Sequence, residues 1–259
     1  MSSAKYYRTE ALTLKNMPLG ESDLLVTLYC KDIGKLRAVA KGARKSTSKL
    51  VGHFEPLTIN NISITKSTNL DIINQAETIE DFDHLKSNLI GMAQGVYINE
   101  LLDGFAPESH SNNDLYILTH NVLKQLSSYS QSRLPLMYFE LHLLRLSGLM
   151  PELYHCVECR EELSPECHRF SSDHGGTLCL QCKPPDSVIR NISLSALKVL
   201  RMLHKANVSR LPELKMSQSA AEELDSILRN TIQFWLDKEI RSKTFLEYLR
   251  RSANDTIYS

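Results

Sequence analysis

The chain has 259 residues, of which 42% are hydrophobic, so it can bury one large core or several smaller ones, and we expect more than one domain. Its formal net charge is zero. The first residues lack the basic stretch and apolar run of a secretory signal, and no window reaches the roughly 18 apolar residues of a membrane span. We therefore expect a protein of the reducing cytoplasm, without a membrane partner.

The zero net charge would argue against a nucleic-acid partner only if charge were spread evenly along the chain, and it is not. Residues 31–49 carry seven basic side chains and one acid, Asp32, a net charge of +6. The rest of the chain is therefore at −6. Within it, residues 71–114 hold nine acids against a single basic residue, Lys86. The sequence thus predicts a cationic segment followed by an acidic middle.

The region up to about Thr78 has the pattern of short β-strands. Apolar and polar residues alternate or cluster, with turn residues between them, and we expect five strands over residues 9–14, 23–30, 35–41, 57–65 and 70–76. A sheet of five short strands has too little partner surface to cover both faces unless it closes on itself. We therefore predict a small barrel.

From about Asp83 the apolar residues follow a helical period, which predicts a long helix to about Phe105. After a polar break, a second helix is expected over residues 115–126, and Pro135 can open a third that runs to about Ser147. Later, Ser193 can cap one helix, and Ser219 with Glu222 forms a capping box for another. Residues 151–185 show neither period and are expected to form a loop between helices.

Two Cys-x-x-Cys pairs lie in that loop, separated by nineteen residues. Such pairs place four thiolates on two tight turns, and the spacing lets them close a tetrahedron around a soft cation. The predicted ligands of a structural zinc ion are Cys156, Cys159, Cys179 and Cys182. Because four protein ligands leave no position for water or substrate, this metal would fold the segment and perform no chemistry.

Two alternatives use the same cysteines. Disulfides are disfavoured in a reducing compartment, whereas a single iron ion fits the same four thiolates and is not separated from zinc by spacing. Four nearby residues are possible substitute ligands: His155, Cys167, His168 and His174.

The cationic segment alternates in residues 35–41, which would put basic residues on one face of a strand and Leu36, Ala38 and Ala40 on the inner face. Residues 42–49 add charge on what we expect to be a flexible, hydroxyl-rich loop. This composition suits contacts with phosphate oxygens and sequence-tolerant binding. The predicted DNA contacts are Lys35, Arg37, Lys41, Arg44, Lys45 and Lys49. A solvated strand without a ligand is the plain alternative, and residues 31–49 hold no aromatic side chain for base stacking.

Four stretches together resemble the bacterial DNA repair family RecO. They are residues 20–28 with Gly34-Lys35 and 39–45, residues 146–153 leading into the first cysteine pair, Phe170-Ser171 with Gly175-Gly176 before the second pair, and residues 240–246. They occur in order over nearly the whole chain. One departure is Arg160, which stands where the family usually has glycine after the second cysteine.

The resemblance implies an α+β multidomain fold: an N-terminal five-stranded OB-like barrel and a mainly helical domain with an inserted four-cysteine zinc loop. We expect the oligonucleotide-binding domain at 1–80, the helical domain at 81–150 and 187–259, and the zinc insert at 151–186. The implied function is a non-enzymatic mediator that binds single- and double-stranded DNA and anneals complementary strands. With RecR, it would help load RecA onto strands coated by single-stranded-DNA-binding protein, in the cytoplasm at the nucleoid. Arg241 and Lys243 would meet the acidic C-terminal tail of that coating protein.

A zinc-containing interaction scaffold that binds protein and no nucleic acid is the alternative function, and the acidic middle of the chain supports it. An enzyme is less favoured, because the sequence shows no nucleophile and base pair, no phosphate-cradling glycine loop and no open metal site.

Overall fold

The computed structural model describes residues 6–129, 131–166, 168–185 and 188–255. The contacts divide the chain into two compact units: Met1–Ser128 with Arg241–Ser259, and Tyr129–Ile240. The first unit is therefore made of two separate stretches of chain. Each unit is described by itself below.

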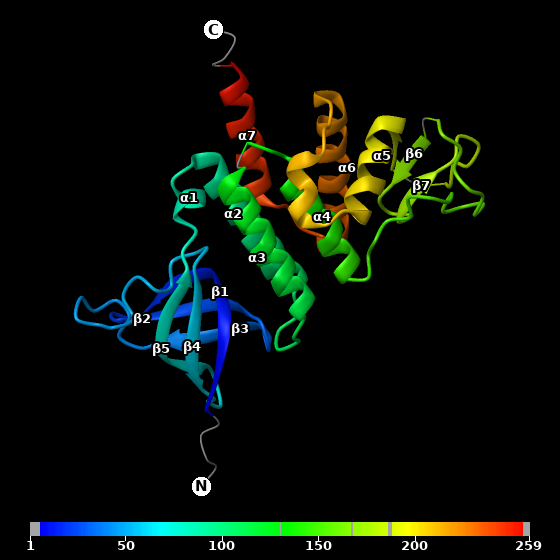
Figure 1. The fold of residues 1–259 in the computed structure, drawn as a ribbon. Helices are drawn as coiled ribbons and strands as arrows, with labels where there is room; N and C mark the ends of the chain where they lie inside the picture. The colour runs from blue at the N-terminus through cyan, green and yellow to red at the C-terminus, as the bar shows by residue number, and fades with distance from the viewer. Residues whose placement is uncertain (1–5, 130, 167, 186–187, 256–259) are drawn as a thin grey trace. The chain divides into compact units, whose positions relative to one another are not determined.

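The first unit begins with a closed five-stranded barrel in the order β1-β2-β3-β5-β4 (Figure 1). The strands are β1 (Tyr6–Leu19), β2 (Asp23–Cys30), β3 (Gly34–Ala40), β4 (Ile59–Thr65) and β5 (Asp71–Glu80). All neighbouring pairs are antiparallel except β3 with β5, whose parallel pairing completes the sheet. The predicted five-stranded N-terminal sheet is confirmed.

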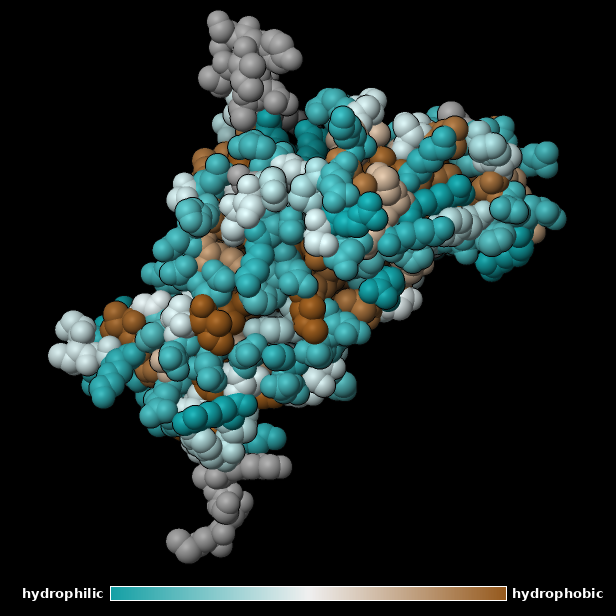
Figure 2. Space-filling model, in the orientation of Figure 1, coloured by the Kyte–Doolittle hydropathy of each residue, from teal (hydrophilic) through white to brown (hydrophobic). Residues whose placement is uncertain are grey.

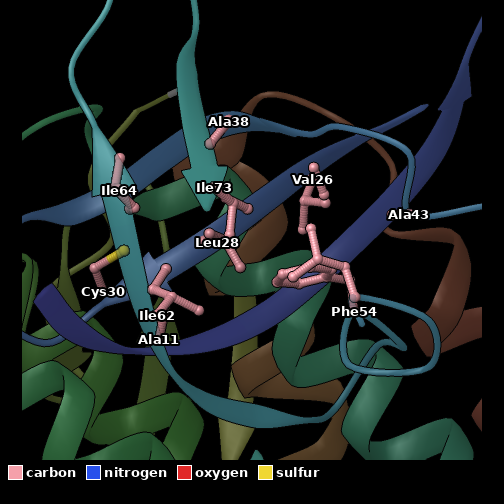
Figure 3. Close-up of a cluster of buried hydrophobic side chains, with 12 residues drawn as sticks. Ala11, Val26, Leu28, Cys30, Ala38, Ala43, Phe54, Ile62, Ile64 and Ile73 are labelled. Atoms are coloured by element: carbon pink, nitrogen blue, oxygen red, sulfur yellow. The ribbon is translucent and has the colours of Figure 1, made fainter. Parts of the chain in front are cut away.

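The barrel is filled by small and β-branched side chains from the inner face of each strand, as the period of two requires (Figure 3). Ala38 and Ala40 are fully buried there, and Leu36 packs against them, so the predicted inner face of β3 is confirmed. The connection after β3 also contributes Ala43, Leu50 and Phe54 to this core, which sets its path across the barrel.

That connection was expected to be a flexible loop; it is confirmed as a loop without helix or strand, and its flexibility stays a prediction. Residues 41–56 form successive turns, whose backbone hydrogen bonds include Lys45 N–H to Gly42 O at 3.0 Å and Ser48 N–H to Lys45 O at 2.9 Å. The amide of Arg44 also donates to Ser22 O at 2.9 Å, in the turn between β1 and β2. The basic residues of this segment are thus carried on an anchored backbone.

The helices of the first unit are α1 (Asp83–Lys86), α2 (Leu89–Phe105), α3 (Asn113–Ser128) and α7 (Arg241–Asp255). The single helix expected from Asp83 is therefore broken. Asn88 lies between α1 and α2 in an extended conformation, and its side chain accepts a hydrogen bond from Gly91 N–H. An asparagine in this role caps the first turn of a new helix, so the backbone breaks at Asn88. Helix α7 packs against α2.

The second unit contains α4 (Leu134–Leu146), α5 (Leu194–Lys205), the 3-10 helix η1 (Val208–Glu213) and α6 (Gln218–Leu236). The predicted end of α4 before Gly148 and the cap of α5 by Ser193 are confirmed. The capping box at Ser219 is wrong, because α6 begins two residues earlier and Ser217 accepts from Ala220 N–H at 3.2 Å.

The cysteine segment holds a three-stranded antiparallel sheet in the order β7-β6-β8, which the sequence analysis missed. Its strands are β6 (His168–Ser171), β7 (Gly176–Leu178) and β8 (Ile189–Ile192). Strands of three or four residues show too little alternation to be recognised by pattern. The segment is thus a folded element with its own sheet.

On the face of the molecule shown in Figure 2, hydrophilic residues cover most of the surface and hydrophobic ones appear in separate patches. Scattered apolar surface of this kind is ordinary for folded proteins. Among the described residues, none of the helices combines the length and the apolar character that crossing a membrane requires.

Candidate metal centre and cationic barrel surface

The four predicted zinc ligands come together in the second unit. The sulfur atoms of Cys156, Cys159, Cys179 and Cys182 all lie within 4.8 Å of one another, and Cys159 Sγ is 3.9 Å from Cys179 Sγ. Four sulfurs bound tetrahedrally to zinc would be about 3.8 Å apart. Among the described residues, this is the one group of three or more ligand side chains that could hold a metal ion.

The small sheet positions both cysteine turns. Val157 N–H donates to Thr177 O on β7 at 3.0 Å, which ties the first turn to the sheet. Arg169 on β6 donates from its guanidinium to the carbonyl oxygens of Cys182, at 3.3 Å, and of Leu180, which holds the second turn.

Gly176 allows its own segment and the segment at Glu152 to approach closely, and this approach aligns the two cysteine turns. Its φ is +153°, and a Cβ at this position would lie 2.5 Å from Glu152 O. Glu152 is hydrogen-bonded on both sides of this point: its N–H donates to Gly175 O at 2.9 Å, and its carbonyl oxygen accepts from Thr177 N–H at 2.9 Å. Any side chain at residue 176 would push the two segments apart.

The thiols influence one another strongly. Burial opposes ionisation of Cys156, but hydrogen bonds from the backbone of Cys179, Cys159 and Glu158 outweigh it and lower the pKa of Cys156 to about 6. Hydrogen bonding to Cys179, with some desolvation, raises the pKa of Cys182 to about 12. Thiolates this close repel one another unless a cation lies among them, so the donor set fits a soft divalent metal ion.

The possible substitute ligands do not join this cluster. His168 Nε2 is 2.7 Å from Ser164 O, and His155 Nδ1 and His174 Nδ1 lie beside the carboxylates of Glu152 and Asp173 at 3.7 and 3.4 Å. Cys167 lies outside the described residues. Four cysteines alone therefore make up the described ligand set.

The predicted DNA-contacting residues lie on the first unit, on β3 and on the turns that follow it. Five of the six are exposed: Arg37, Lys41, Arg44, Lys45 and Lys49. The Arg44 guanidinium donates to Gly20 O at 3.1 Å and to Glu21 O at 3.2 Å, so it is positioned over the turn between β1 and β2. The nearby Asp23 carboxylate accepts from Gly42 N–H, which is the main reason for its lowered pKa.

Lys35 is held differently. Its side chain is 13% exposed, and its ammonium donates to Asp103 O at 2.6 Å, with the Asp103 carboxylate 3.8 Å away. Arg37 and the acids Asp103 and Glu108 also line one pocket of about 220 Å³. The acidic end of α2 therefore offsets the charge on β3, and the turns carry most of the cationic surface.

A groove that no local sequence pattern indicated lies on the strands β1, β4 and β5 of the barrel. It has a volume of about 390 Å³ and is lined by Arg8 of β1, by amides of β4 and β5 including Asn61 and Gln75, and by Lys49 from the turns. Arg8 Nε donates to the hydroxyl of Tyr6, whose ring is 52% exposed. The alternation of Tyr6 and Arg8 on β1 could have shown that they share a face, but only the sheet register brings Ser63 opposite Arg8.

The two residues expected at a partner site are in α7. Arg241 is exposed, whereas Lys243 is 1% exposed with its ammonium 4.9 Å from the centre of the Tyr97 ring on α2. Backbone N–H groups at the start of α7 donate to the Glu100 carboxylate on α2. To reach a partner, Lys243 would have to leave the packing between these helices.

Comparisons with known proteins cover most of the chain. Residues 1–82 match the family model described as Recombination protein O N terminal, and residues 86–244 match Recombination protein O C terminal. The chain is 32% identical to the DNA repair protein RecO of Dehalococcoides mccartyi strain 195, over 97% of this chain and 99% of that protein. It is 33% identical to the RecO protein of Desulforamulus reducens over 96% of each, and 34% identical to that of Roseiflexus strain RS-1, over 95% of this chain and 87% of that one.

Proposed function

Because the chain belongs to the RecO family of DNA repair proteins, we propose that it is a recombination mediator that binds single- and double-stranded DNA and anneals complementary strands. In this proposal it works with RecR to load RecA onto strands coated by single-stranded-DNA-binding protein, in the cytoplasm at the nucleoid. Its role is to hold and exchange strands, without catalysis. Residues 1–80 would be the DNA-binding domain, 81–150 and 187–259 the helical domain, and 151–186 the zinc insert.

The observation that carries this proposal is the cationic turn surface of Lys41, Arg44, Lys45 and Lys49, which continues through Lys49 into the amide-lined groove beside Tyr6. Cations that follow a phosphate backbone, together with an exposed aromatic ring and amide groups for the bases, are the usual parts of a single-strand platform. The exposed ring of Tyr6 supplies the stacking side chain that residues 31–49 lack.

The direct test is the salt dependence of DNA binding. Each phosphate contact releases a counterion, so replacing Arg37, Lys41 and Arg44 with alanine should weaken binding of a single strand and flatten the slope of log affinity against log salt by about 2. Fluorescence anisotropy over a salt series measures both quantities. The matched control removes three exposed cations from the second unit, at Arg210, Lys215 and Lys238, and should keep the slope.

Unchanged affinity and slope in the barrel variant would contradict the DNA-binding assignment. Salt-insensitive binding of a protein partner, with no nucleic acid bound, would favour the alternative of a zinc-containing interaction scaffold.

We further propose that the four cysteines bind zinc as a structural ion. The sulfur spacing supports this, as does the position of both turns on one small sheet. Elemental analysis of protein purified without chelator should find about one zinc per chain, and Cys179→Ser should lower thermal stability more than DNA affinity. Iron in place of zinc, or no metal, would contradict the identity of the ion.

For the tail of the single-stranded-DNA-binding protein, we propose a contact on α7. Arg241 lies one and two turns before the exposed rings of Phe245 and Tyr248, at spacings that place all three on one helix face. A cation beside apolar rings suits an acidic, hydrophobic peptide. Arg241→Ala should reduce the affinity for a fluorescent tail peptide. Equal affinity of the variant and the wild-type chain would contradict a contact on this helix face.

A further inference from the structure

A pocket of about 300 Å³ lies beside the first cysteine turn in the unit formed by Tyr129–Ile240. Its lining includes Glu152, Tyr154, Arg160, His174 and His204. This volume is at the lower end of the range found for pockets that hold small ligands. The cysteine cluster and the proposed barrel surface use none of these five side chains, so the pocket has no assigned role.

Two polar atoms in the lining are buried without a hydrogen-bond partner in the part of the chain that the structure describes. They are the hydroxyl oxygen of Tyr154 and Nδ1 of His204, and the two rings are 6.4 Å apart. Buried polar groups are nearly always paired, so two unpaired ones in one pocket point to a missing partner. Both can donate a hydrogen bond, and a ligand rich in acceptor oxygens would satisfy both.

The surroundings of Tyr154 are cationic. The guanidinium carbon of Arg201 is 4.9 Å from the centre of the Tyr154 ring, and the ammonium of Lys205 is 5.3 Å from it. Arg160 is a third cation, and it lines the pocket itself. Within the described residues, none of these three cations forms an ion pair.

Two acids lie nearby, and each already has donors of its own. Glu152 Oε1 accepts from the backbone N–H groups of Tyr154, at 2.7 Å, and His155, at 3.1 Å. Asp173 lies 3.4 Å from His174 and accepts from Ser171 and from the backbone of Val188. Because these hydrogen bonds partly offset the negative charge of both carboxylates, the pocket remains suited to an anion.

Arg160 has a strained backbone, with φ of +66°, in the left-handed region where glycine costs least. Its amide donates to Cys156 O at 3.0 Å, which fixes this conformation in the cysteine turn. Glycine would serve the turn better, so the arginine side chain must contribute elsewhere, and it lines the pocket.

We propose that this pocket binds a phosphomonoester, the terminal phosphate of a DNA strand or of a free nucleotide, through Tyr154, His204 and Arg160. A phosphomonoester offers three acceptor oxygens and nearly two negative charges, which match two hydrogen-bond donors and a guanidinium fork. A peptide carboxylate offers one charge and two oxygens in a plane, and matches them less well. A DNA repair protein meets phosphorylated strand ends, which favours the nucleic-acid source.

The experiment uses the full, metal-loaded protein and three single strands of one sequence, with a 5′-phosphate, a 3′-phosphate or neither. Fluorescence anisotropy should show one phosphorylated strand binding roughly tenfold more tightly than the unphosphorylated strand. If the source is a free nucleotide, a mononucleotide should instead bind in calorimetry while the three strands bind equally. Tyr154→Phe, which keeps the ring and removes the hydroxyl, should reduce either signal several-fold.

Arg160→Gly separates a binding role from a structural one. It should raise the melting temperature because it relieves the left-handed strain, and it should remove the preference for phosphate. The control Arg210→Ala removes one exposed cation from the same unit and should keep the preference. The barrel variant at Arg37, Lys41 and Arg44 should lower the affinity for all three strands by the same factor. The test therefore distinguishes a failure of the pocket proposal from a failure of the proposed DNA-binding surface.

Equal affinity for all three strands together with no mononucleotide binding would overturn the inference. An acidic peptide that binds in a Tyr154-dependent manner while inorganic phosphate does not compete would also overturn it.

Discussion

The cationic side chains of the barrel differ in what holds them, and this determines how much charge each can offer to a ligand. Lys35 is turned toward the end of α2, where its ammonium meets both the carbonyl and the carboxylate of Asp103. Arg44 has its guanidinium over the carbonyls of Gly20 and Glu21, yet it is exposed. We therefore expect Lys35 to stabilise the fold and the exposed residues to bind phosphate.

Replacing Lys35 separates these roles. Lys35→Ala removes a hydrogen bond from a mostly buried ammonium and should lower the free energy of unfolding by about 1–2 kcal/mol. Lys45→Ala, at an exposed position with the same charge, should stay within about 0.5 kcal/mol. Urea denaturation measures both. Equal destabilisation by the two variants would contradict the distinction.

A buried histidine in the second unit makes stability depend on pH. His142 is 6% exposed, with Nε2 3.1 Å from Leu203 O, and desolvation lowers its pKa below the usual 6.5. The unfolded chain therefore takes up a proton before the folded one does, and the stability that neutral His142 contributes is lost as pH falls from about 6.5 through the lower folded pKa. His142→Gln should make the decline in unfolding free energy between pH 7 and 5.5 shallower. An unchanged slope would exclude this group as a cause.

Residue identity alone could not show which predicted site residues are accessible. Lys243 lies in a basic stretch of sequence, but its side chain is buried against Tyr97, which is almost 150 residues earlier. Arg8 and Lys49 line one groove because β1 and β4 pair and the turns cross the barrel. These are long-range arrangements, and local pattern contains no information on them.

At the scale of elements, the sequence predicted the strands and helices that show a clear local pattern of apolar residues. Alternation or clustering of apolar residues identified all five barrel strands, because each contributes side chains to the core. The strands of the cysteine segment went unrecognised because each has only three or four residues, too few for a pattern to show. The break at Asn88 was missed because the apolar stripe continues on both sides of it.

The start of α6 shows the same limit and gives a sharp test. Ser217 and Ser219 both suit an N-cap, but only Ser217 accepts the hydrogen bond from Ala220 N–H. Ser217→Ala should lower the free energy of unfolding by about 1 kcal/mol, and Ser219→Ala, at an exposed position inside the helix, by less than about 0.5 kcal/mol. Thermal denaturation distinguishes them. A larger loss at Ser219 would place the cap where the sequence pattern put it.

At the scale of the whole molecule, the chain leaves the first unit after Ser128 and returns to it with α7. The carboxylate of Glu100 on α2 accepts from the backbone N–H groups of Arg241 and Ser242, which fastens the returning helix. The predicted domains, with one helical domain at 81–150 and 187–259, did not place α7 in the same unit as the barrel. The return places α7 and the barrel in one compact unit, so the proposed DNA surface and the proposed peptide contact belong to the same unit.

The net charge of the whole molecule likewise does not show where charged residues lie. The net charge of zero combines a segment at +6 with an acidic remainder, and most of the exposed basic residues of that segment lie on the turns after β3. A mediator needs such a surface to engage strands, because phosphate contacts supply most of the sequence-independent affinity. The central claim is therefore that these turns enable strand exchange and annealing.

The most direct measurement is the rate of annealing of two complementary strands, each coated with single-stranded-DNA-binding protein, in the presence of this protein. The account predicts that the wild-type chain anneals the coated strands, that the variant at Arg37, Lys41 and Arg44 does so at least roughly tenfold more slowly, and that the variant at Arg210, Lys215 and Lys238 keeps the wild-type rate. Equal rates for all three proteins, or no annealing above the coated strands alone, would contradict it.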